Sequence, residues 1–199
     1  MKGPEPGRPK IIRTTEEHLP VIAELAGLIW RACYPDIISR AQIEYMLARM
    51  YALDTLRGEI RSEGIRYDLL LVNNQPAGFA AYGPTPEPDV MKLHKLYVLP
   101  ELHGRGLGSL LLRHVEQQVR AAGAHGLVLS VNKRNGQAIT AYKRNGFTIA
   151  DSVVTDIGGG FVMDDYVMMK PLAPNPAGKE GTRSVPEKSQ EPTSGGSVC

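Results

Sequence analysis

The sequence predicts an α/β fold in which helices cover the faces of one mixed β-sheet. A length of 199 residues, 42% of them hydrophobic, is enough for one domain with a substantial core. Apolar residues recur at helical spacing from Val21 to Trp30 and from Leu107 to Val119. Short apolar or alternating runs lie between such segments and are typical of strands. Because helices and strands alternate along the chain, we expect them to pack in layers.

The first part of the chain predicts a short strand and two helices. The strand covers 10–13, and Thr14 or Thr15 can cap the helix that follows. Residues 34–36, Tyr-Pro-Asp, end this helix, because proline cannot continue it and restricts the residue before it. Ser39 then caps a second helix with one apolar face.

A hairpin and a central strand are expected next. Residues 58–66 are polar and irregular. Two apolar strands, 67–72 and 77–82, are joined by the turn-forming residues 73–75. Residues 90–99 then alternate as a further strand.

The second half of the chain predicts two more helices and a final hairpin. One helix covers 106–122, and another covers 136–144 with Asn135 as its cap and Asn145-Gly146 as its stop. The strands are 126–131, 147–155 and 161–169. The chain therefore predicts seven strands and four helices.

Both ends of the chain differ in composition from the domain between them. Residues 1–9 are polar with three prolines, and 173–199 are rich in Pro, Gly and Ser without an aromatic residue. Such segments bury too little apolar surface to offset the entropy lost on ordering. We expect a disordered leader (1–9), one domain (10–172) and a disordered tail (173–199).

Charge and cysteine usage argue against several function classes. A net charge of +2 with scattered Lys and Arg does not favour a nucleic-acid partner. The two cysteines, Cys33 and Cys199, cannot form a disulfide framework. No apolar run approaches the ~18 residues of a membrane span. His and Cys do not occur at metal-ligand spacing. We therefore expect a cytoplasmic protein without a membrane partner or a metal.

Residues 103–109, His-Gly-Arg-Gly-Leu-Gly-Ser, join a predicted strand to a predicted helix. Glycine at 104, 106 and 108 lets backbone N–H groups turn toward one concavity without Cβ clashes. The helix start adds its unpaired amides and the positive end of its dipole. Such a loop suits phosphate or pyrophosphate, although similar glycines also occur in plain strand-to-helix turns.

Two blocks of residues resemble the GNAT superfamily of N-acetyltransferases. They are 96–100 with 103–108, and 129–132 with Asn135, Ala138, Tyr142 and 145–147. The order of elements is similar over about 10–170, and the departure is His103, where the family has Arg or Gln. The resemblance implies the GNAT fold, with a mixed, mostly antiparallel sheet of about seven strands and about four helices. It also implies acetyl-CoA as co-substrate.

The resemblance further implies how acetyl-CoA is held. Loop amides contact the pyrophosphate, and the strand before the loop splays from the next strand, so that the pantetheine arm inserts between them. The implied cofactor-binding residues are Leu96, Tyr97, Val98, His103, Gly104, Arg105, Gly106, Leu107, Gly108, Ser109, Asn135 and Tyr142. The Val98 amide is the implied donor to the thioester carbonyl.

Two side chains are the expected catalytic groups. By resemblance, Tyr142 points at the sulfur of CoA, where its hydroxyl can protonate the leaving thiolate. A primary alkylamine resembles Lys, with a pKa near ~10.4, so it needs a proton acceptor at pH 7. His94 is the expected acceptor, because alternation places it on the strand face of Leu96 and Val98. Direct attack in a ternary complex is expected, because neither cysteine carries a nucleophile signature.

The resemblance places the acceptor between the first two helices, their connecting loop and the last hairpin. Tyr34, Asp36 and Asp164 are the candidate substrate residues, with Asp165 as a third carboxylate. These carboxylates could hold a cationic acceptor such as a polyamine, or they could be solvated turn residues. We expect the primary amine of a small molecule, a polyamine or an amino acid, as acceptor and a homodimer as the assembly. A protein or peptide N-acetyltransferase and a catalytically silent acyl-CoA-binding module stay open as alternatives.

Overall fold

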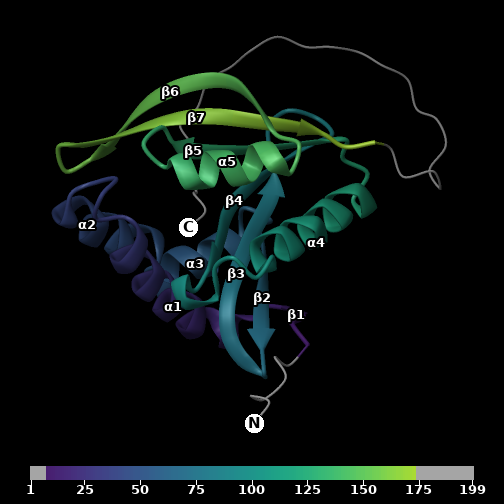
Figure 1. Cartoon of the computed structure of the whole chain (residues 1–199), viewed down its shortest axis with the longest axis horizontal. Helices are drawn as coiled ribbons and strands as arrows, with labels where there is room; N and C mark the ends of the chain where they lie inside the picture. The colour runs from purple at the N-terminus through teal and green to yellow at the C-terminus, as the bar shows by residue number, and fades with distance from the viewer. Residues whose placement is uncertain (1–7, 174–199) are drawn as a thin grey trace.

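The computed structural model describes residues 8–173, and its seven strands form one sheet in the order β1-β2-β3-β4-β5-β7-β6 (Figure 1). The strands are β1 (Lys10–Arg13), β2 (Arg66–Val72), β3 (Gln75–Pro84), β4 (Val90–Val98), β5 (Gly126–Asn132), β6 (Thr148–Gly158) and β7 (Phe161–Pro171). All neighbours are antiparallel except β4 and β5, which confirms the mixed, mostly antiparallel sheet. The predicted leader and tail lie outside the described residues, apart from positions 8, 9 and 173.

Helices cover both faces of the sheet. The helices are α1 (Leu19–Cys33), α2 (Arg40–Met50), α3 (Leu53–Arg61), α4 (Leu107–Ala121) and α5 (Gly136–Arg144), with short 3-10 turns at Glu16–His18 and Pro100–Leu102. One apolar cluster buries α4 and α5 against the sheet, with Leu111 and Val115 fully buried. The other cluster buries α1, α2 and α3, with Ile22 and Trp30 at its centre. None of the helices within 8–173 is both long and apolar enough to cross a membrane.

Short-range signals determine several of the turns and caps. Asn73 and Asn74 have φ values of 53° and 61°, and β2 and β3 pair on either side of them. Positive φ at both central residues is typical of the type I′ turn, which matches the twist of a hairpin. The Ser39 hydroxyl accepts a hydrogen bond of 3.2 Å from the Gln42 amide and caps α2. These features confirm the predicted hairpin and helix start.

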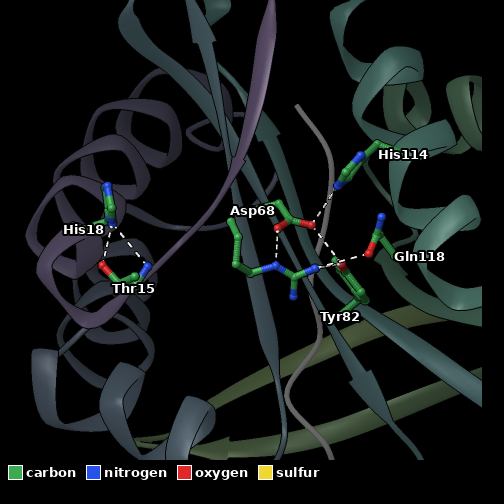
Figure 2. Close-up of polar contacts among 7 residues, drawn as sticks. Thr15, His18, Asp68, Tyr82, His114 and Gln118 are labelled. Atoms are coloured by element: carbon green, nitrogen blue, oxygen red, sulfur yellow. Dashed lines mark hydrogen bonds and ion pairs between the residues drawn. The ribbon is translucent and has the colours of Figure 1, made fainter. Parts of the chain in front are cut away.

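The first helix begins later than predicted. Thr15 starts a 3-10 turn instead, and its amide donates to Nδ1 of His18 at 3.2 Å (Figure 2). The α-helix follows from Leu19, with Pro20 in its first turn. Proline fits best there because its missing N–H has no intrahelical partner at that position.

The predicted elements do not include α3, and irregular chain is expected over 58–66. The helix has a short apolar stripe of Leu53, Leu56 and Ile60, which packs in the cluster beneath α1 and α2. Further support for α3 comes from the distant strand β4, where Lys95 donates to both carboxylate oxygens of Glu59 at 2.7 and 2.6 Å. The predicted number of helices is therefore too low by one.

Asp68 interrupts an apolar strand because it organises the contact between the sheet and α4. Its side chain is 1% exposed and accepts a 2.8 Å hydrogen bond from the Tyr82 hydroxyl (Figure 2). Arg13 of β1 and His114 of α4 each approach the same carboxylate at 3.0 Å. Four elements are tied together at this one buried charge.

The β6–β7 hairpin reaches across to α2 (Figure 1). The Tyr45 hydroxyl donates to the carbonyl of Ile157 at 2.9 Å, and Nε2 of Gln42 donates to the carbonyl of Val162 at 2.9 Å. Met163 of β7 belongs to the apolar cluster beneath α1 and α2. The first helices and the last hairpin therefore meet, as the resemblance implied for the acceptor region.

Candidate active site

A pocket of about 600 Å³ lies where the end of β4, the start of α4 and the helix α5 meet. It brings together the two blocks of residues that were singled out from the sequence. The predicted cofactor residues that line it are Leu96, Val98, His103, Gly104, Gly106, Leu107, Gly108, Ser109 and Tyr142. Arg105 and Asn135 are close in sequence but do not line this pocket.

The backbone of the glycine loop is shaped for close approach. Gly104 and Gly106 have φ values of 75° and 74°, in the left-handed region that favours glycine. Gly108 lies in the helix with ordinary φ, and a Cβ built there meets no protein atom within 4 Å. Neither conformation nor packing of this chain requires glycine at 108, so a ligand that needs the space is the natural reason for it.

The start of α4 supplies hydrogen-bond donors to this loop. Gly106 is the N-cap and has no side chain to bond to the first amides of the helix. The amides of Leu107, Gly108 and Ser109 therefore keep their donor capacity beside the pocket. Together with the helix dipole, these donors suit the diphosphate group of coenzyme A.

β4 and β5 separate next to the pocket. Their parallel pairing runs from Val90 with Gly126 to Leu93 with Leu129. β4 nevertheless continues to Val98, and β5 continues to Asn132. The sheet is therefore split along this stretch, as the resemblance implies.

The register of β3 and β4 determines which main-chain groups face the split. The Leu99 amide donates to the carbonyl of Ala77 at 2.9 Å, which makes this a hydrogen-bonded pair. Because such pairs alternate along an antiparallel ladder, the amides of Val98 and Leu96 point away from β3 and toward the split. Tyr97 lies between them and directs its main chain toward β3. Its predicted main-chain contact with the cofactor does not fit this register.

His103 connects the loop to the strand. Its Nε2 donates to the carbonyl oxygen of Val98 at 2.9 Å. The departure from the family pattern at 103 therefore has a structural role in this chain.

The α5 side of the pocket holds Tyr142. The Tyr142 ring is 2% exposed and makes an edge contact with Phe147 at 5.5 Å. Asn135 caps α5 by accepting from the Ala138 amide at 3.0 Å, which confirms the predicted cap. Nδ2 of Asn145 donates to Oγ of Ser109 at 3.2 Å and links the ends of α5 and α4.

Sequence reasoning missed much of the α5 contribution. The additional lining residues are Leu102, Leu112, Gly136, Gln137, Ala138, Thr140, Ala141, Arg144 and Asn145. Gln137, Ala141 and Arg144 stand three or four positions apart, so they share one face of the helix with Thr140. This spacing, taken together with Tyr142, could have indicated them.

His94 lies at a bulge, which corrects the face predicted for it. The β3–β4 register skips His94, and Leu93 and Leu96 both pack in the cluster beneath α4. Simple alternation therefore no longer places His94 with Leu96. Burial, followed by the charges of Lys92 and Lys95, lowers the pKa of His94 to about 3. The ring is neutral at pH 7 and is a weaker proton acceptor than predicted.

Two of the three predicted substrate residues, Asp36 and Asp164, lie beside the chain that follows β5. The Tyr34 ring is buried and stacks on Trp30, with ring centroids 4.5 Å apart. The main-chain oxygen of Asp36 accepts from Arg134 at 2.9 Å, and the Asp164 carboxylate pairs with Lys133. Asp36 and Asp164 thus flank one loop, while Tyr34 belongs to the core.

Side chains that could bind a metal ion are not clustered in the described part of the chain. No cluster of three His, Cys, Asp or Glu side chains suited to a metal ion occurs among residues 8–173.

Comparison with known proteins gives a consistent match to one family. The model of the acetyltransferase (GNAT) family matches residues 24–147. The spermidine N(1)-acetyltransferase of Thermoplasma acidophilum is 26% identical over 159 residues, which cover 78% of this chain and 95% of that protein.

Solved structures show the same architecture. PaiA N-acetyltransferase from Thermoplasma acidophilum in complex with coenzyme A has a TM-score of 0.71 and 25% identity, covering 82% of this chain and 99% of that chain. The ribosomal-protein-S18-alanine N-acetyltransferase from Escherichia coli has a TM-score of 0.65 at 20% identity, covering 87% and 100%. At that identity the second likeness concerns the fold alone.

Proposed function

The chain belongs to the acetyltransferase (GNAT) family and is an acetyl-CoA-dependent N-acetyltransferase; from this premise we propose that its acceptor is a primary amine of a small cationic molecule. One observation carries the proposal, namely the split between β4 and β5 beside a glycine-loop pocket. A thioester held from the pocket side reaches the opposite face of the sheet through this split. An amine that approaches from that face can attack it directly.

The pocket suits coenzyme A in three parts. The amides from Gly104 to Ser109 would hold the diphosphate. The pantetheine arm would lie in the split and pair with the main chain of Leu96 and Val98, as an added strand does. Arg144 lines the same pocket and adds a positive charge for the phosphate groups.

Two groups of this chain would assist acetyl transfer. The Val98 amide points into the split, where it can donate to the thioester oxygen as negative charge develops. One well-placed donor of this kind can lower the barrier by roughly 3–4 kcal/mol. The Tyr142 hydroxyl would donate a proton to the leaving sulfur. His94, with its low pKa, could contribute as a neutral hydrogen-bonding group beside the amine.

Two features favour a small cationic acceptor. Asp36 flanks the loop after β5, and its carboxylate could contact a second ammonium group of a polyamine, whereas Asp164 pairs with Lys133 and points away from the acceptor face. The similarity to a spermidine N(1)-acetyltransferase extends over 95% of that protein. Together they support a polyamine-like substrate.

A thiol-release assay with acetyl-CoA tests the proposal. The panel contains polyamines, monoamines, amino acids and peptides with a free N-terminus or lysine. We expect the highest kcat/KM with a polyamine. A preference for peptides would replace the proposal with a protein or peptide acetyltransferase. Acetyl-CoA binding without thiol release for any acceptor would support a silent binding module instead.

A further inference from the structure

A buried carboxylate lies beside the open part of the split. Asp165 of β7 is 3% exposed and stands opposite Asn132 of β5. Asn132 lies beyond Leu129, where the pairing of β4 and β5 ends. Asp165 therefore lies on the strand next to β5, which borders the split, and paired strands such as β5 and β7 are about 5 Å apart.

Asp165 faces the side of the sheet that is opposite the pocket. Met163, two residues earlier, packs in the cluster beneath α1 and α2, whereas Met168 packs beneath α4 and α5. The irregularities of the β6–β7 pairing lie in β6, so side chains alternate regularly along β7. The Asp165 side chain thus shares the face of Met163, which is the face an incoming amine must use.

The carboxylate is incompletely paired. Its Oδ1 is buried and has no hydrogen-bond partner among the residues that the structure describes. The charged groups that act on it are Lys92 of β4, Lys133 after β5 and the neighbouring Asp164, while Asn132 offers a side-chain hydrogen bond. β6 places the apolar Val153 opposite it. An unpartnered carboxylate oxygen in such surroundings is suited to a cationic ligand.

We propose that Asp165 is a catalytic residue, whose Oδ1 binds the acceptor ammonium and takes one proton from it. This inference rests on the proposed function. The N–H bond breaks, an O–H bond forms on Asp165, and the neutral nitrogen attacks the thioester carbon. As the new N–C bond forms and the C–S bond breaks, the amine loses a second proton. Tyr142 passes a proton to the leaving sulfur and regains one from the amine, and Asp165 later releases its own proton to solvent.

The pKa values of the two candidate proton acceptors, Asp165 and His94, support the choice of Asp165. Burial raises the pKa of Asp165 to about 6, and the positive charge of Lys92 opposes the shift. The pKa of His94 is lowered to about 3. Asp165 is therefore charged at pH 7 and retains a captured proton better than His94. The carboxylate of Asp165 also supplies the negative charge that attracts an ammonium group.

The test compares Asp165→Asn with the matched control Asp151→Asn, which removes an exposed carboxylate from the edge strand β6. Two acceptors are used at saturating acetyl-CoA: a primary alkylamine and methoxyamine, which is already neutral at pH 7. For the alkylamine, wild type and the control should show kcat/KM rising to a plateau above pH 6. Asp165→Asn should lose about 10²-fold at pH 7 and keep rising toward the pKa of the amine. With methoxyamine, all three proteins should react at similar rates.

Several outcomes would overturn the inference. One is an unchanged alkylamine pH profile in Asp165→Asn. Another is an equal loss with both acceptors while acetyl-CoA affinity is retained, because this indicates a structural role. If Asp165→Asn does not fold, the pH profiles of wild type are sufficient. A fall of kcat/KM below pH 6 with methoxyamine as well as with the alkylamine would contradict the inference. Failure of wild type to bind acetyl-CoA would instead contradict the proposed function.

Discussion

Nε2 of His103 donates a 2.9 Å hydrogen bond to the main-chain oxygen of Val98 and so holds the glycine loop against the end of β4. The loop amides are proposed to bind the diphosphate of acetyl-CoA, and the Val98 amide is proposed to bind the thioester oxygen at its other end. Together with the turn bonds from the Leu102 amide to Leu99 and from the His103 amide to Pro100, this hydrogen bond sets their relative position. Its loss should affect affinity for coenzyme A before it affects the fold.

His103→Ala should weaken acetyl-CoA binding roughly fivefold, because one net hydrogen bond is worth about 1 kcal/mol. Isothermal titration calorimetry measures the change. His125→Ala serves as the control, since His125 is exposed and does not line the pocket. Equal affinity of both variants and wild type would show that the hydrogen bond does not position the loop.

Gly106→Val should abolish acetyl-CoA binding, because valine resists a φ of 74° and its side chain would occupy the phosphate site. Gly123→Val is a matched control, as Gly123 has a φ of 88° at the far end of α4. Both substitutions should destabilise the fold by about 1–2 kcal/mol. Loss of binding in both variants would indicate strain rather than a blocked site.

Tyr142→Phe should lower kcat by about 10²-fold while leaving the Kd of acetyl-CoA nearly unchanged, because the hydroxyl acts on the leaving sulfur. Steady-state kinetics and calorimetry together separate the two effects. Wild-type turnover in this variant would exclude Tyr142 as the proton donor.

Lys95→Met should destabilise the protein by about 3–5 kcal/mol, because it leaves the buried carboxylate of Glu59 without its cation. The double variant with Glu59→Leu should recover most of this loss in urea unfolding. The exposed pair of Arg57 and Asp54 is the control, and Arg57→Met should cost at most about 1 kcal/mol. A small effect of Lys95→Met would contradict the role of this pair in anchoring α3.

Asp165 should also make stability depend on pH. Its folded pKa of about 6 lies above the ordinary value of 3.8. The stability it contributes is therefore full below pH 3.8 and is lost as pH rises through 6. Between pH 4 and pH 7, wild type should lose up to about 3 kcal/mol more than Asp165→Asn in urea unfolding. Parallel pH curves for the two proteins would contradict the raised pKa.

Local chemistry made much of the fold predictable. The Asn73–Asn74 turn, the caps at Ser39 and Asn135 and the glycines of the loop depend on residues a few positions away. The helical spacing of Leu53, Leu56 and Ile60 could have indicated α3, but the contact of Glu59 with Lys95 of a distant strand could not be predicted. The sequence also could not indicate the bulge at His94, which arises from the register between β3 and β4.

Prediction from local sequence has the same limit on the acceptor side of the site. Asp164 and Asp165 are adjacent carboxylates with equal sequence signals. Alternation relative to Met163 decides that Asp165 is buried, while Asp164 points outward to Lys133. Such a difference depends on which face of β7 packs against α1 and α2, which come from the other end of the domain.

A crystal structure of the protein with coenzyme A tests the central claim most directly. We predict the diphosphate on the amides of Gly104 to Ser109, the pantetheine arm between β4 and β5, and the sulfur beside Tyr142. A diphosphate bound elsewhere, or a split that stays closed to the ligand, would contradict it.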